Sequence, residues 1–282
     1  MFNAVHNAGS SVHHNGMSLF LATVPEGVLF HHGTTRPESP SDPDRLAYEI
    51  EHAEGFTRSF GGPPRQTKPH PEPMPGGAAN EQKIIGRTTH LSDHETGWLH
   101  VYRTSRPLQF LYVDGMSGGK SANGTPDTQD YLLRSDPSYG KAEREASPTI
   151  DLGERKRAQS LCKLCKEWNL QGIIRMEAGF EIIKCNFTDG MDQVQVFRRP
   201  GSRGRGKLWA ETQHFEYLRG VAERNFDIRS SRTVVDYSST VSAFFFPVNL
   251  ANPDPKRPDL PRLSEASHAE LVALKRIFNG HY

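Results

Sequence analysis

The sequence has little cysteine, little net charge and no long apolar run. The three cysteines among 282 residues do not make a disulfide framework. A net charge of +1 gives no reason to expect nucleic acid or an anionic membrane surface as the main partner. No apolar stretch approaches the length of a membrane span, so we expect no membrane partner either.

Apolar residues are also scarce, at 35% of the chain with a mean hydropathy of -0.63. The 25 glycines and 20 prolines agree with a chain that contains much loop. Its length suits one large domain or two small ones. The first residues lack the basic and apolar regions of a signal peptide. We therefore favour an intracellular protein, or a secreted one if the N-terminus given is trimmed.

Metal-binding patterns are incomplete, and we predict no metal site. Cys162 and Cys165 have Cys-x-x-Cys spacing, but no second pair or nearby histidine completes a zinc set. Both fall on the apolar face of a helix expected over 154–169, which predicts buried structural thiols. The histidines near the N-terminus have no carboxylate or cysteine at ligand spacing.

The order of elements predicts an α+β fold with a split, mostly antiparallel sheet and helices packed around it. We expect a core over 1–187 with a Pro/Gly-rich insertion at 61–80, and a C-terminal extension over 188–282. The expected core strands are 28–32, 46–48, 98–104, 108–113, 173–176 and 180–185, with a helical turn over 51–57. The extension is expected to contain a helix near 212–224, a β-prone segment over 234–246, a Pro-rich linker over 253–261 and a last helix. The Ser267-x-x-Glu270 capping box begins that helix, which should bury Leu271, Leu274 and Phe278.

An early strand ends in His-Gly-Thr, at residues 32–34. Strand alternation places His32 on one face with Phe30 and Val28, and His31 on the other. Gly33 lets another group come close to the backbone. The end of this strand is therefore a candidate binding position.

A second candidate position is Glu181, a carboxylate inside the otherwise apolar run 179–185. Glu177 competes with it for an acidic role. We prefer Glu181 because it lies within the strand, whereas Glu177 falls in the expected turn before it.

The His-Gly-Thr strand, the segment 46–56 and the Glu-bearing strand together resemble the ADP-ribosyltransferase-like superfamily. The resemblance covers residues 25–187 and implies binding and cleavage of NAD. By resemblance, His32 would hydrogen-bond a ribose hydroxyl and the Gly33 backbone would hold the nicotinamide carboxamide. Tyr48 would stack on the nicotinamide ring. Glu181 would bind the 2′-hydroxyl of the nicotinamide ribose.

The same resemblance implies a catalytic set of Glu181, His32 and Tyr48, with Thr34 completing the first motif and Phe56 as the alternative to Tyr48. Breaking the N-glycosidic bond puts positive charge on the ribose, which a fixed carboxylate in a low-dielectric cleft stabilises. The implied activity is ADP-ribosyl transfer, with a protein as a possible acceptor, or NAD glycohydrolysis. The chain is also similar to uncharacterised fungal proteins of comparable length.

Two alternatives remain open. One is a non-catalytic binding protein on the same scaffold, with the 61–80 insertion and the C-terminal tail as interaction surfaces. The other is a nucleotide-dependent enzyme that uses the Gly-rich loop 114–121. That loop departs from a P-loop because Asp114 stands at the first glycine position and no helix start follows. The loop could instead supply polar groups to the site above: Lys120, Asp127, Gln129 or Asp130.

Overall fold

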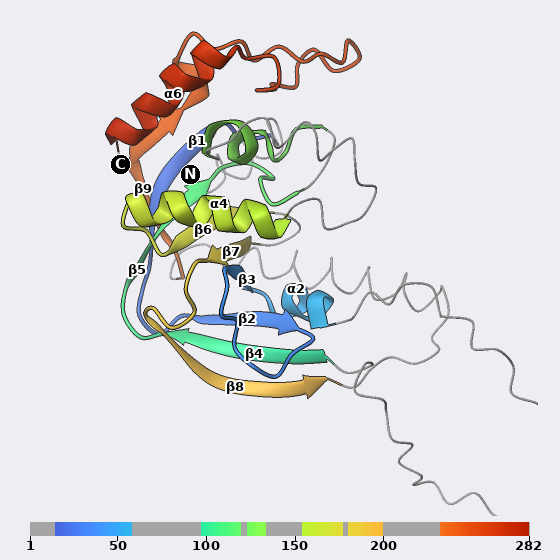
Figure 1. Ribbon diagram of the computed structural model, residues 1–282, viewed down its shortest axis with the longest axis vertical. Helices are drawn as coiled ribbons and strands as arrows, with labels where there is room; N and C mark the ends of the chain where they lie inside the picture. The colour runs from blue at the N-terminus through green and yellow to red at the C-terminus, as the bar shows by residue number, and fades with distance from the viewer. Residues whose placement is uncertain are drawn as a thin grey trace, which may run out of the picture.

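The computed structural model describes residues 15–57, 97–119, 123–133, 154–176, 180–199 and 232–281 (Figure 1). Nine strands form one sheet in the order β8-β4-β2-β3-β7-β6-β5-β1-β9. They are β1 (Ser18–Val24), β2 (Leu29–Thr34), β3 (Asp44–Ala47), β4 (Gly97–Thr104), β5 (Leu108–Val113), β6 (Gly172–Met176), β7 (Phe180–Lys184), β8 (Met191–Arg199) and β9 (Val234–Ser242).

All strand pairings except β5–β6 are antiparallel, so the predicted mostly antiparallel α+β class is confirmed. The sheet is one mixed sheet and not two separate ones. Its thinnest point is between β2 and β3, which pair only through His31 and Ala47. The prediction of a split sheet is therefore wrong, because the sheet is continuous and a weak seam between β2 and β3, the β2–β3 seam, joins its two parts.

The helices lie around this sheet. They are α2 (Ile50–Glu54), the 3-10 turn η1 (Gly55–Thr57), the π-helical turn η3 (Thr128–Leu133), α4 (Glu154–Glu167), the 3-10 turn η5 (Ala243–Phe245) and α6 (His268–His281). In Figure 1, α2 lies against β2 and β3, and α4 lies beside β6 and β7.

The sheet bends around one apolar cluster on its inner face. This cluster takes large side chains from strands β1 to β7, among them Phe20, Phe30, Leu46, Tyr48, Tyr102, Phe110, Tyr112, Ile174 and Ile182. The opposite face carries a second cluster, which α4 and α6 cover with residues that include Leu161, Leu164, Leu274 and Phe278. Alternation along each strand decides which cluster a side chain joins, as with Ile173 and Ile174.

The C-terminal extension supplies both edge strands, β8 and β9, and the last helix. The capping box is confirmed, since Ser267 N donates to Glu270 Oε2 at 2.7 Å and Glu270 N donates to Ser267 Oγ at 3.3 Å. Leu271, Leu274 and Phe278 are buried as expected. The expected insertion at 61–80 and helix over 212–224 lie outside the described residues.

Helix α4 confirms the expected helix, ending two residues earlier, and Asn169 follows it with a left-handed φ of 56°. Cys165 is a free, buried thiol, and burial raises its pKa to about 12. The expectation of a thiol at Cys162 is wrong, because Cys162 forms a disulfide with Cys185, just after β7. This bond ties α4 to the strand that carries Glu181.

Candidate functional site

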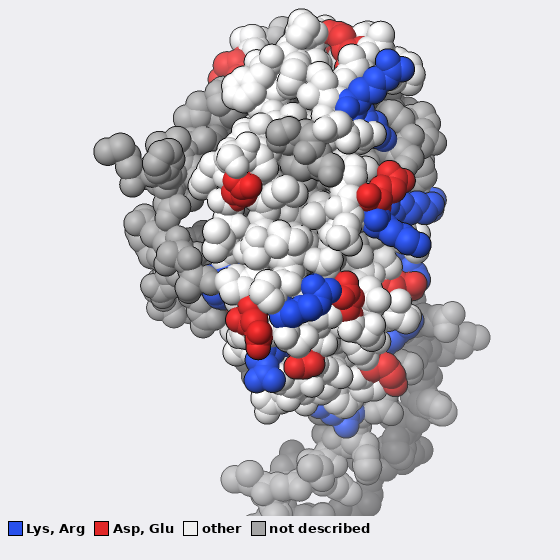
Figure 2. Space-filling model, turned by 90° about the vertical axis from the view of Figure 1, so that its left-hand side faces the viewer, with Lys and Arg blue, Asp and Glu red and all other residues white. Residues whose placement is uncertain are grey.

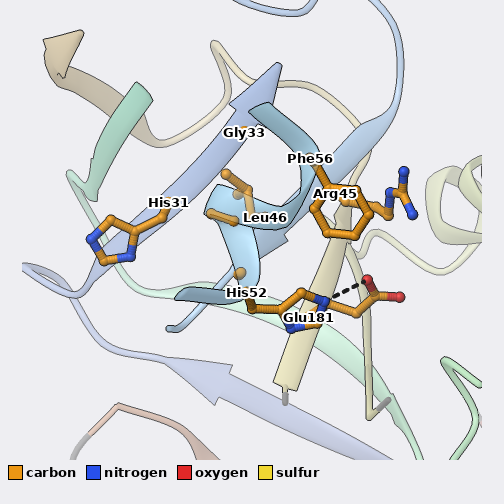
Figure 3. A pocket seen from close by; sticks show the side chains of 9 residues that line it. His31, Gly33, Arg45, Leu46, His52, Phe56 and Glu181 are labelled. Atoms are coloured by element: carbon orange, nitrogen blue, oxygen red, sulfur yellow. Dashed lines mark ion pairs between the residues drawn. The ribbon is translucent and has the colours of Figure 1, made fainter. Parts of the chain in front are cut away.

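A small cavity lies at the β2–β3 seam, where α2 and η1 cross the sheet (Figure 3). Its non-atom space, open mouth included, is about 170 Å³. It is lined by His31, Gly33, Arg45, Leu46, Ala47, His52, Ala53, Phe56 and Glu181. Water can enter only about 10 Å³ of this space, which is roughly the room that one water molecule needs, so the cavity as it stands is water-sized.

Two glycines let α2 and η1 lie directly on the sheet. A Cβ at Gly33 would overlap the carbonyl oxygen of Ala53, and one at Gly97 would overlap the carbonyl oxygen of Thr57. The predicted close approach at Gly33 is therefore present, and the approaching group is the backbone of α2. This contact brings His52 and Phe56 to the cavity wall.

Glu181 lies in this wall, 1% exposed. On β7 it pairs with Ala47 of β3 on one side and with Arg175 of β6 on the other. Arg175 Nε donates to its Oε1 at 2.5 Å, and its Oε2 lies 3.8 Å from His52 Nε2 (Figure 3). Glu181 is thus a carboxylate held on one oxygen by a buried guanidinium while the other faces a histidine.

This ion pair belongs to a buried chain of charges. Arg175 also pairs with Glu154 at the start of α4, and Arg157 Nη1 donates to Glu154 Oε2 at 2.6 Å. Arg157 Nε in turn donates to Asp130 Oδ1 at 2.8 Å. Burial opposes the charge on Arg175, but the carboxylates of Glu154 and Glu181 outweigh it and raise its pKa. Removing one partner from such a chain costs about 3–5 kcal/mol.

Phe56 supplies an aromatic ring beside the cavity. The Arg45 guanidinium lies 4.0 Å from its ring centroid, and the His52 ring lies 5.6 Å away, tilted by 31°. An aromatic face flanked by polar groups suits a flat ring that carries hydrogen-bonding substituents. Of the two aromatic residues considered from the sequence, Phe56 is the one at the cavity.

His32 lies on the opposite face of the sheet from Glu181. Because His31 and Glu181 both pair with Ala47, these three side chains share one face, and His32 points the other way. Its Nδ1 is 2.7 Å from the Arg45 carbonyl oxygen. The alternation predicted for the two histidines is therefore right, whereas the single site of His32 and Glu181 that the resemblance implies is wrong.

The surroundings of His32 are those of a core residue. Its ring packs 5.8 Å from the His100 ring and 5.5 Å from the Phe187 ring. It is 3% exposed, and burial lowers its pKa, so the imidazole is neutral at neutral pH.

Tyr48 also lies in the inner cluster. Its ring meets Phe30 edge to face at 4.8 Å, and its hydroxyl lies 2.6 Å from Thr233 Oγ1. Burial raises the pKa of this hydroxyl. Thr34, at the end of β2, accepts a hydrogen bond from Arg36 N at 3.3 Å. Neither residue lines the cavity.

Three polar residues of the cavity wall were not assigned from the sequence: His31, Arg45 and His52. Alternation alone gives His31 the same face as Gly33, and that signal was available. The contribution of His52 depends on where α2 crosses the sheet, which sequence spacing does not specify.

The polar residues proposed for the Gly-rich loop stabilise the fold. Asp127 accepts from Arg262 Nε at 2.8 Å and from Leu263 N at 3.0 Å. Gln129 Oε1 accepts from Arg175 Nη1 at 3.0 Å. Lys120 lies outside the described residues. Gln129 and Asp130 therefore reach the candidate site only indirectly, through the buried charge chain.

Within the described ranges, no helix is both long and apolar enough to cross a membrane. In the same part of the chain, no group of three or more His, Cys, Asp or Glu residues is placed to hold a metal. On the face shown in Figure 2, acidic and basic side chains are interspersed and do not form a patch of one sign.

Comparison with known proteins gives one family model and two relatives. The model, described as the YPL277C N-terminal domain, matches residues 80–199, which include Glu154, Arg175 and Glu181 but not the His-Gly-Thr strand. The Saccharomyces cerevisiae uncharacterized protein YOR389W is 28% identical over 203 residues, covering 68% of this chain and 31% of that protein. Uncharacterized protein YPL277C of the same yeast is 30% identical over 204 residues, covering 68% of this chain and 40% of that protein.

No solved structure matches the chain. The alignments span less than half the length of either yeast protein, so these two are not of comparable length to this chain. The cavity and the charge chain behind it thus belong to a chain that is similar to uncharacterised fungal proteins.

Proposed function

We propose that the protein cleaves the nicotinamide–ribose bond of NAD at the β2–β3 cavity, by hydrolysis or by transfer of ADP-ribose to an acceptor. The observation that carries the proposal is the buried Glu181 carboxylate, held by Arg175 in the wall of a small cavity beside Phe56. The resemblance of the His-Gly-Thr and Glu-bearing strands to ADP-ribosyltransferase-like proteins supports it further.

In the proposed reaction the glycosidic C–N bond breaks and its electron pair stays with nicotinamide, which leaves as a neutral molecule. The positive charge of the nicotinamide ring passes to the ribose, and the Glu181 carboxylate stabilises it there. Water or an acceptor then bonds to the ribose carbon and releases one proton. Because charge reaches the ribose only as the bond breaks, this contact stabilises the transition state more than bound NAD.

The proposal revises the roles implied by the resemblance. Phe56, not Tyr48, stacks on the nicotinamide ring, and the Gly33 backbone lies near the carboxamide. His31 and His52 supply the polar contacts first assigned to His32. His32 and Tyr48 then hold β2 and β3 in place from the inner cluster. Because the cavity as it stands is water-sized, it would have to widen to admit the nicotinamide ring of NAD.

Release of nicotinamide from NAD by the purified protein tests the proposal. Wild type should release it, and Glu181→Gln should lower kcat by about 100- to 1,000-fold, because the amide cannot stabilise positive charge. Glu167→Gln, on the exposed side of α4, is the matched control and should behave as wild type. Failure of the wild type to bind or cleave NAD would contradict the proposal.

That failure would favour the second candidate, a non-catalytic binding protein on the same scaffold. The observation in its favour is that His32 and Tyr48 are packed in the core and that Glu181 is part of a structural ion-pair chain. Binding of NAD with no nicotinamide release from either wild type or Glu181→Gln would support this candidate over the enzyme.

A further inference from the structure

We infer that Arg175 is a positioning residue for Glu181, and that Glu154 anchors Arg175 to α4. The inference rests on the proposed function, because it assigns Glu181 the reacting position. It adds two residues on other elements, β6 and α4, that set where that carboxylate lies and whether it is ionised.

Arg175 is fixed by three partners. Its Nε donates to Glu181 Oε1 at 2.5 Å, its Nη1 donates to Gln129 Oε1 at 3.0 Å, and its Nη2 donates to Glu154 Oε1. The residue is 1% exposed. A planar guanidinium bound on three nitrogens cannot rotate without breaking several bonds, so it presents a fixed donor to Glu181.

The anchor is itself tied to the fold. Glu154 is also bound by Arg157, which is paired with Asp130 of η3. The Cys162–Cys185 disulfide joins α4 to the end of β7, four residues beyond Glu181. The position of the Glu181 carboxylate is therefore fixed both by its own strand, β7, and by α4.

The charge on Arg175 also favours an ionised Glu181. A buried carboxyl without a cationic partner takes up a proton, whereas an adjacent guanidinium favours the carboxylate. The titratable and charged groups around Glu181 are Arg175 on β6, Glu154 on α4 and His52 on α2. Arg45 on β3 and His31 on β2 line the same cavity. Without Arg175, Glu181 would be buried without this cation and close to the Glu154 carboxylate. Burial and the repulsion between the two carboxylates would both favour protonated Glu181.

A buried ion pair away from the cavity provides the control. Arg262 Nε donates to Asp127 Oδ2 at 2.8 Å, with side chains 11% and 0% exposed. It ties the segment before α6 to the loop before η3 and does not line the cavity. Arg262→Met should therefore reproduce the cost of breaking a buried pair without changing Glu181.

The experiment compares wild type, Arg175→Met, Arg175→Lys and Arg262→Met. Nicotinamide release is measured against pH, and the protonated-carboxyl band is measured by difference infrared spectroscopy at neutral pH. Arg175→Met should lower kcat by about 100-fold with little change in KM, and should move the acid limb of the pH profile upward. Its new carboxyl band should disappear in Arg175→Met/Glu181→Gln. Arg175→Lys should keep Glu181 ionised and the pH profile unshifted, with a smaller loss of kcat. If Arg175→Met does not fold, Arg175→Lys provides the test in its place.

The inference is overturned if Arg175→Met shows no Glu181-dependent band, or if its pH profile matches those of wild type and Arg262→Met. An equal shift in Arg262→Met overturns it too, because the effect would then be a general loss of stability. If no protein releases nicotinamide but the Glu181-dependent band appears in Arg175→Met, the proposed function fails while the assignment of Arg175 stands.

Discussion

Removing the Cys162–Cys185 disulfide should destabilise the protein by an amount that can be worked out from the chain. The bond joins α4 to the end of β7 across a sequence separation of 23 residues. Closing a loop of that length in the unfolded chain gives about 3 kcal/mol of stabilisation by the chain-entropy model. We therefore expect Cys162→Ala/Cys185→Ala to lower the free energy of unfolding by about 3 kcal/mol.

Urea-induced unfolding of the oxidised wild type and of the double variant measures this difference. Thermal unfolding should show it as a fall in Tm of about 6–12 °C, since 1 kcal/mol corresponds to about 2–4 °C in a domain of roughly this size. A thiol reductant should move the wild-type curve to that of the variant and leave the variant unchanged. Thiol titration of the unfolded, oxidised wild type should find one free thiol, Cys165.

Three free thiols in the oxidised wild type would refute the disulfide. Coincident unfolding curves for oxidised wild type and double variant would refute the argument from loop closure. Because α4 carries Glu154, the variant also reports on the charge chain, and its nicotinamide release should be lost at a lower temperature than that of wild type.

Two further predictions concern stability. Gly33→Ala should destabilise the protein, because a Cβ there meets the Ala53 carbonyl oxygen. The control Gly280→Ala, where a Cβ would meet no atom within 4 Å, should be neutral or slightly stabilising. Equal urea midpoints for the two variants would contradict this prediction. Burial lowers the pKa of His32 and of His100 below the ordinary 6.5, so the native state holds both imidazoles neutral while the unfolded chain takes up protons. The free energy of unfolding should stay constant above pH 6.5 and decrease as the pH drops below 6.5, by up to about 1.4 kcal/mol per pH unit for each histidine. The decrease should be smaller in His100→Phe. Urea midpoints that do not change between pH 7 and pH 5 would contradict the assignment.

Local patterns predicted the elements well. The antiparallel pair β6–β7, α4 and the capped last helix depend on hydrophobic spacing and on residues within a few positions of one another. The β-prone segment over 234–246 contains β9, as expected, but β8 and the places of both strands at the sheet edges were not predicted, since joining a sheet edge requires partners far along the chain.

The candidate site was predicted in part. Glu181 and Gly33 meet at the cavity, and Phe56, first the alternative to Tyr48, lies there too. His32 and Tyr48 do not, because the β2–β3 pairing at His31 and Ala47 turns both into the inner cluster. A shift of one residue would exchange the faces, and the sequence does not contain the register explicitly.

The sequence by itself determined an α+β chain with a carboxylate inside an apolar strand and two adjacent histidines on opposite faces. These follow from composition and from the two-residue period of a strand. The tertiary structure decided that His52 faces Glu181 and that Arg175, itself paired with Glu154, binds Glu181. It also decided that Cys162 forms a disulfide with Cys185. Each of these contacts joins different secondary-structure elements, so their distances are fixed only when the sheet and α4 pack together.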